Sequence, residues 1–111
     1  MGSEQLIWMD GKLVEASKAT MPFLNGAAHY GAAVFEGIRC YDTARGPAVF
    51  RLREHMERMV DSAVVFGFRN LPYTVAELCQ ATIDTVNANN LKECYIRPLI
   101  SAVDKDRKSV V

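Results

Sequence analysis

The most unusual stretch of this sequence, HYGAAVFEGIRCY (residues 29–41), places a glycine inside a predicted strand, between an aromatic residue and a cation. Because side chains alternate along a strand, Phe35, Gly37 and Arg39 share one face. A glycine there costs about 0.5–1 kcal/mol relative to alanine, and it often marks the close approach of a ligand or of another backbone. The pattern predicts a binding notch; the alternative is a bulge, or packing of the glycine against a helix.

A second pair of functional side chains has the same spacing. In ECYIRPLIS (residues 93–101), Tyr95 and Arg97 are two positions apart, so a strand presents both on one face. A phenol and a guanidinium on one face can hold a carboxylate through charge-assisted hydrogen bonds. The alternative for Arg97 is an ion pair with a nearby acid on an edge strand. Because Pro98 cannot donate to a ladder, this strand is expected to lie at a sheet edge or to be locally irregular.

Arg58 is the third candidate, on a predicted helix four residues after Glu54. It is either half of an i,i+4 ion pair worth a few tenths of a kcal/mol, or an anchor for a phosphate or carboxylate, which guanidinium geometry suits. His55, on the same helix, is interpreted as a packed or capping histidine.

Other kinds of chemistry have little support in the sequence. There is no GxGxxG or GxxxxGK[ST] nucleotide loop and no GxSxG elbow. Two histidines do not suggest a metal site, and three cysteines without CxxC spacing are interpreted as buried free thiols of a cytoplasmic protein. Thirteen basic and thirteen acidic residues give no electrostatic reason to expect nucleic acid or an anionic membrane as a partner. No lysine lies in an apolar segment that would make it a nucleophile.

Hydrophobic periodicity predicts an α+β domain in which two helices pack on a mostly antiparallel sheet. Asp10-Gly11 is a type I′ turn signal between two short strands. Gly67 is expected to end the first helix, and Thr74 with Glu77 forms a capping box before the second helix. The expected elements are strands at 6–9, 12–15, 33–41, 48–50 and 93–101, and helices from about 51 to 66 and from 74 to 88.

We assign residues 1–103 to one domain and treat 104–111 (DKDRKSVV) as a separate segment. This segment shows neither a helical nor a strand pattern, and its possible codons resemble a sequencing adapter. We therefore interpret it as a non-native tail.

Three strings, HYGAAVFEGIRCY, REHMER and YIRPLI, together with the hairpin start IWMDGKLV, resemble the small N-terminal domain of the branched-chain amino acid aminotransferases, which are fold-type IV pyridoxal-phosphate enzymes. The resemblance covers the chain from Leu6 to about Val103. It implies pyridoxal 5′-phosphate as cofactor and an amino transfer from leucine, isoleucine or valine to 2-oxoglutarate. It also implies small amino acid and 2-oxo acid substrates, and a homo-oligomer of two or more subunits.

The resemblance implies roles for individual residues. Arg58, the last residue of REHMER, matches the arginine that holds the cofactor phosphate. Tyr30, Phe35 and Gly37 match positions that line the substrate pocket, with Tyr30 reaching across a dimer interface into the neighbouring site.

Tyr95 and Arg97 match residues that bind substrate carboxylates, and Arg97 serves the distal carboxylate of glutamate or 2-oxoglutarate. Arg39 is expected to be structural. In this family the Schiff-base lysine lies in a second domain beyond residue 111, so no catalytic residue is expected here and the chain alone is expected to be inactive.

Three alternatives remain. D-amino acid aminotransferases and aminodeoxychorismate lyases share the architecture, although VFEGIRCY and YIRPLI favour the branched-chain group. The chain could instead be a carboxylate-binding module without turnover, or a protein that pairs with an intact enzyme.

Overall fold

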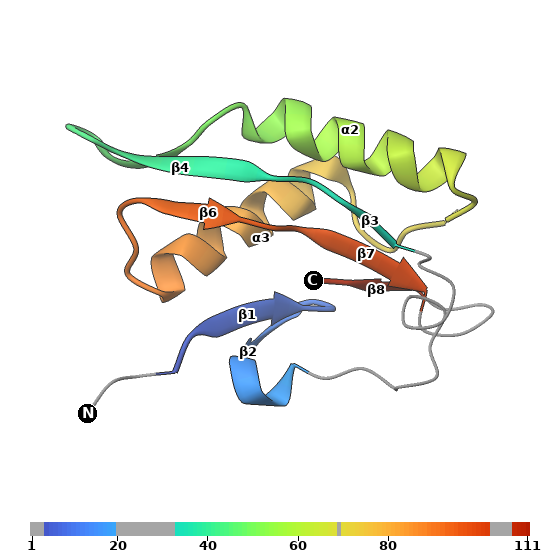
Figure 1. Ribbon diagram of the computed structural model, residues 1–111, viewed down its shortest axis with the longest axis horizontal. Helices are drawn as coiled ribbons and strands as arrows, with labels where there is room; N and C mark the ends of the chain where they lie inside the picture. The colour runs from blue at the N-terminus through green and yellow to red at the C-terminus, as the bar shows by residue number, and fades with distance from the viewer. Residues whose placement is uncertain (1–3, 20–32, 69, 103–107) are drawn as a thin grey trace.

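The computed structural model of the chain describes residues 4–19, 33–68, 70–102 and 108–111. The predicted pocket residue Tyr30 lies outside these ranges. The architecture is α+β, as the sequence predicts: two long helices and eight short strands in three antiparallel sheets, among the described residues (Figure 1).

The chain begins with the predicted hairpin. Strands β1 (Leu6–Met9) and β2 (Lys12–Glu15) pair antiparallel. The turn has positive φ at Asp10 (50°) and Gly11 (94°), the left-handed geometry that asparagine, aspartate and glycine accept most readily. A short 3₁₀ helix, η1 (Ala16–Lys18), follows.

Each of the two long predicted strands is interrupted once. Residues 33–41 form β3 (Ala33–Phe35) and β4 (Ile38–Thr43), and residues 93–101 form β6 (Cys94–Ile96) and β7 (Leu99–Ala102). Strand β5 (Gly46–Val49) pairs with β4 and fills the place predicted for 48–50. The strand orders are β5-β4-β6 in one sheet and β3-β7-β8 in another.

The helices form where the apolar period changes. Helix α2 (Leu52–Val65) ends before Gly67, whose φ of +94° suits a helix stop. Helix α3 (Val75–Ala88) begins with the predicted capping box: Thr74 Oγ1 accepts from the Glu77 amide at 3.1 Å, and the Glu77 carboxylate accepts from the Thr74 amide at 2.9 Å. Among the residues described, neither these nor any other helix has the length and apolar character needed to cross a membrane.

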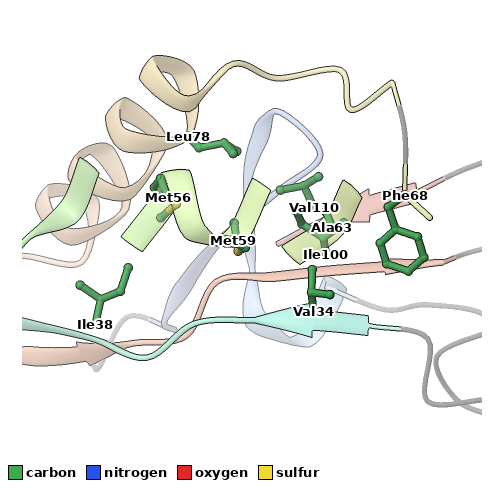
Figure 2. Close-up of a cluster of buried hydrophobic side chains, with 9 residues drawn as sticks. All are labelled: Val34, Ile38, Met56, Met59, Ala63, Phe68, Leu78, Ile100 and Val110. Atoms are coloured by element: carbon green, nitrogen blue, oxygen red, sulfur yellow. The ribbon is translucent and has the colours of Figure 1, made fainter. Parts of the chain in front are cut away.

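The core lies between the two helices and one face of the strands. Met56, Met59 and Ala63 of α2 pack toward Val34 and Ile38 (Figure 2), and each of these five side chains is at least nine-tenths buried. The cluster is completed by Phe68, Leu78, Ile100 and Val110. Among the described residues the helices cover only this face, and Phe35, Arg39 and Tyr95 on the opposite face of β3, β4 and β6 are exposed; we call this the open face.

The end of the chain differs from the sequence prediction. We expected no regular structure after residue 103, but Lys108–Val110 form strand β8, which pairs antiparallel with β7 (Figure 1). Val110 is 2% exposed and belongs to the core, and its amide and carbonyl bond to Asp10 in the hairpin turn. A short strand can form without an alternating pattern of its own when a neighbouring edge offers free backbone partners. Its non-native origin stays a prediction, which sequencing the gene through this point would check.

Met59 gives a direct test of this core. Met59→Ala removes a side chain with no exposed surface and should lower the free energy of unfolding by about 2–5 kcal/mol. Val65→Ala, in the same helix at an 88% exposed position, should change it by less than about 0.5 kcal/mol. Urea denaturation followed by circular dichroism measures both. Equal losses in the two variants would contradict this core.

Candidate functional site

Two paired strand segments carry most of the predicted site. Phe35 is opposite Leu99 where β3 pairs with β7, and Ile38 is opposite Ile96 where β4 pairs with β6. The register is therefore the same on both sides of the interruption, and it puts Gly37 opposite Arg97. No residue is inserted, so the predicted alternative of a bulge at Gly37 is wrong.

The interruption itself has a chemical cause. Pro98 has no N–H to donate to the ladder, and the Glu36 amide donates to the Pro98 carbonyl at 3.2 Å. The predicted irregularity at Pro98 is confirmed. It falls at the centre of a paired strand rather than at a strand end, so the two strands change sheets together beside Gly37 and Arg97.

The predicted alternation of side chains is confirmed by burial. Val34, Glu36, Ile38 and Cys40 are all less than 9% exposed and face the helices. Phe35, Gly37, Arg39 and Tyr41 face the open side, together with Tyr95 and Arg97 from the neighbouring strand. Arg39 is opposite Tyr95 in the register, and its expected structural role stays a prediction.

Tyr95 lies over Gly37 in the space that a side chain at this position would occupy. A Cβ added to Gly37 would collide with the Tyr95 hydroxyl and would be 3.1 Å from the ring carbon that bears it, which is tighter than ordinary van der Waals contact. The sequence predicts that a ligand or another backbone approaches Gly37 closely. The group that approaches it in the structure is the side chain of Tyr95, from the same domain. Packing of Gly37 against a helix is excluded, since the contact is on the open face.

Arg97 extends the same contact chain. Its Nη2 donates to the Tyr95 hydroxyl at 2.8 Å, and its guanidinium carbon is 4.5 Å from the Phe35 ring centroid and 5.4 Å from that of Tyr95. In the described part of the chain no carboxylate forms an ion pair with Arg97. The guanidinium therefore keeps donors for an external anion while it stacks on aromatic rings.

The side chain of Arg58 is held by the carboxylate of Glu36, a partner that the sequence does not predict. Its Nη2 and Nε donate to Glu36 Oε1 and Oε2, at 2.7 and 3.0 Å. The predicted i,i+4 alternative with Glu54 is wrong, because Glu54 pairs instead with Arg51 at 3.2 Å. His55 Nδ1 is 2.9 Å from Glu36 Oε1, so the half-buried His55 shares the same partner.

These contacts set the charge of the buried group. Hydrogen bonds from Arg58 lower the pKa of the Glu36 carboxyl below its usual value, with a smaller contribution from His55, while burial acts in the opposite direction. Glu36 also raises the pKa of Arg58. One signal could have revealed this pairing: Glu36 is the acidic member of an otherwise apolar, inward-facing set.

Arg58 fits a phosphate. Glu36 uses two of the five N–H donors of the guanidinium, and the Arg58 side chain remains 67% exposed. The described lysines Lys12, Lys18 and Lys92 are exposed, so none has the apolar surroundings of a nucleophilic amine.

The remaining titratable groups add no second site. No group of three or more metal-ligating side chains gathers in the part of the chain that the structure describes. Cys40, Cys79 and Cys94 are free thiols, as predicted, but only Cys40 is fully buried. Partial burial raises the pKa of Cys79 and of Cys94.

A cavity of about 310 Å³ lies between β1, α3 and the β6–β7 segment. Its lining is mainly apolar and includes Tyr95 and Arg97, but Phe35, Gly37 and Arg58 do not line it. The cavity therefore shares Tyr95 and Arg97 with the open strand face, and the candidate site is that face together with the Arg58 side chain.

Known proteins share the sequence and the fold of this chain. Residues 33–110 match the model of the family Amino-transferase class IV. The chain is 47% identical over 98 residues to the branched-chain-amino-acid aminotransferase of Escherichia coli K12, covering 88% of this chain and 31% of that protein. It is 45% identical over 95 residues to the Pseudomonas aeruginosa enzyme of the same name, covering 86% and 31%. The chain thus spans about a third of the length of these curated relatives.

Solved structures agree with the sequence relatives. The crystal structure of the Escherichia coli branched-chain amino acid aminotransferase superposes with a TM-score of 0.89 at 39% identity, over 98% of this chain and 38% of that one. The branched-chain enzyme of Thermoproteus uzoniensis, solved with norvaline, gives a TM-score of 0.87 at 40% identity, over 98% and 39%. A further branched-chain amino acid aminotransferase, complexed with N-(5′-phosphopyridoxyl)-L-glutamate, gives a TM-score of 0.89 at 40% identity, over 97% and 39%.

The pairing of Glu36 with Arg58 makes stability depend on pH. The lowered pKa of Glu36 means that its stabilising effect is complete above the ordinary value of 4.5 and is lost as the pH falls through the folded-state value. Acidification from about pH 5 downward should therefore destabilise the wild-type chain more than Glu36→Gln. Urea denaturation across this range measures the difference. Glu57→Gln, which removes an exposed pair with Arg53, is the control, and parallel profiles for wild type and Glu36→Gln would contradict the pairing.

Proposed function

Because the chain belongs to the class IV amino-transferases, we propose that it forms the small N-terminal domain of a branched-chain amino acid aminotransferase. Residues 1–103 make up this domain in the proposal. Its task is to supply one wall of the substrate pocket and one anchor for the cofactor phosphate. The named relatives favour this enzyme over the D-amino acid aminotransferases and aminodeoxychorismate lyases.

The observation that carries the proposal is the contact between Phe35 and Arg97. An apolar ring and a guanidinium share one surface, 4.5 Å apart, without an acidic partner in the described residues. Such a surface suits two kinds of substrate in turn. The side chain of leucine, isoleucine or valine packs on Phe35, and the distal carboxylate of 2-oxoglutarate or glutamate bonds to Arg97.

Tyr95 and Gly37 shape the same wall. The hydroxyl of Tyr95 accepts a hydrogen bond from Arg97 and can donate its own proton to a substrate carboxylate. Gly37 leaves the space in which that hydroxyl lies. Together they hold Arg97 over Phe35 instead of letting it extend into water.

Pyridoxal 5′-phosphate is the proposed cofactor, and it supplies the electron sink for amino transfer when bound. Arg58 would hold its phosphate with the donors that Glu36 leaves free. In the proposal the whole protein is a cytoplasmic homo-oligomer, and Tyr30 completes the substrate pocket of a neighbouring subunit.

Substitution of Arg97 in the complete gene product tests the substrate assignment. Arg97→Ala removes charge-assisted bonds to the distal carboxylate, so KM for 2-oxoglutarate should rise by about 10-fold or more. KM for leucine should change by less than about 3-fold, because its side chain carries no charge. Steady-state kinetics measure both, with Arg53→Ala on the exposed surface of α2 as the matched control. An equal rise in both KM values would sink the assignment.

The 111-residue chain itself should not bind the cofactor covalently. Lys12, Lys18 and Lys92 are exposed and have no apolar site that favours a stable bond to an aldehyde. After mixing with pyridoxal 5′-phosphate and dialysis, the purified chain should show no visible absorption band, whereas the complete gene product should keep one. A band that survives dialysis of the chain would refute this expectation.

A further inference from the structure

Burial of Glu36 costs the fold free energy, because its carboxylate loses hydration. Glu36 is 7% exposed, on a strand face whose other members are Val34, Ile38 and Cys40. A buried carboxylate must be paired and hydrogen-bonded to offset its lost hydration, and replacing a whole buried ion pair by apolar residues is often neutral or better for stability. The fold alone does not require an acid here, so the reason for one lies in the side chains that Glu36 holds.

Its two oxygens fix the orientation of Arg58. Both contacts, at 2.7 and 3.0 Å, engage the Nε–Nη2 edge of the guanidinium, which is the bidentate geometry that sets direction as well as strength. The third nitrogen, Nη1, has no part in this contact. A 67% exposed arginine without such a partner would sample many rotamers in water.

His55 holds the carboxylate in turn. It lies three residues before Arg58 on α2, so the two side chains project from the same side of the helix. Its Nδ1 is 2.9 Å from Glu36 Oε1, and the ring is 20% exposed. The carboxylate is thus held from two positions of one helix.

We propose that Glu36 is a positioning residue for the phosphate of the cofactor, acting through the orientation it gives to Arg58. This inference rests on the proposed function, in which Arg58 binds that phosphate. Glu36 stands between Phe35 and Gly37, which face the substrate side of the same strand. Successive residues of one strand segment thus serve the proposed substrate wall and the proposed phosphate anchor.

If net charge alone decided phosphate binding, Glu36 would weaken it instead of supporting it. A carboxylate beside Arg58 cancels part of its positive charge and repels a phosphate, so its removal would strengthen phosphate binding if charge were decisive. Positioning predicts that removal weakens it. The sign of the effect distinguishes the two.

The experiment compares two forms of the cofactor on the complete gene product. Dissociation constants are measured for pyridoxal 5′-phosphate and for pyridoxal, which lacks the phosphate, by spectroscopic titration of the apoprotein. Glu36→Gln should weaken binding of pyridoxal 5′-phosphate by about 10-fold and leave pyridoxal unchanged. In an Arg58→Met background the same substitution should add nothing. Glu57→Gln, which removes an exposed glutamate–arginine pair of the same helix, is the matched control.

Three results would overturn the proposal. These are tighter or unchanged binding of the phosphorylated form by Glu36→Gln, equal weakening of both forms, or a full effect in the Arg58→Met background. If Arg58→Met alone does not reduce the preference for pyridoxal 5′-phosphate over pyridoxal, the proposed role of Arg58 is wrong. This result is obtained with Glu36 unchanged, so it is distinguishable from a failure of the proposal about Glu36.

A second variant covers the case in which Glu36→Gln does not fold. His55→Ala removes one support of the carboxylate and should give a smaller loss in the same direction, restricted to the phosphorylated form. A loss shared equally by both forms in His55→Ala would also overturn the proposal.

Discussion

The alternation of side chains along residues 33–40 underlies the arrangement of the candidate functional groups that the structure describes. Phe35 and Gly37 face the open side, and Glu36 between them faces the helices. A shift of one residue in the pairing with the neighbouring strand would exchange the two sets, exposing Ile38 and burying Phe35. The apolar core contacts of Val34 and Ile38 with α2 make that shift costly, so the packing of the core also fixes the site.

The arrangement of side chains on the open face depends on the absence of a side chain at Gly37. Because Gly37 has no Cβ, the Tyr95 ring can lie against the strand, and its hydroxyl then accepts from Arg97. Arg97 in turn stacks on Phe35. An apolar ring and a cation are presented together at the point where Pro98 interrupts the ladder. On the opposite face of the strand the carboxylate of Glu36 is buried, and two side chains, His55 and Arg58, act as its partners.

Elements governed by neighbours in sequence were predicted well. The hairpin turn at Asp10, the stop at Gly67 and the capping box at Thr74 follow from backbone geometry and short-range hydrogen bonds, and all are confirmed. Strand β8 was missed, because its formation depends on the free edge of β7 and on burial of Val110 rather than on its own pattern. The interruption of the two long strands was only half predicted, from Pro98, because its position opposite Glu36 depends on register.

The sequence by itself determined the family resemblance, the faces of the strands and the residues of the open side, since these depend on residue types at fixed spacing. It did not determine which groups Gly37, Arg97 and Arg58 contact, and only the tertiary structure decided these contacts. Gly37 accommodates Tyr95 instead of a bulge or a helix, Arg97 stacks on aromatic rings without an acidic partner in the described residues, and Arg58 pairs with Glu36 across 22 positions of sequence instead of with Glu54. Each choice is a contact between segments far apart in the chain, and its energy depends on distances that exist only once the helices have packed on the strands.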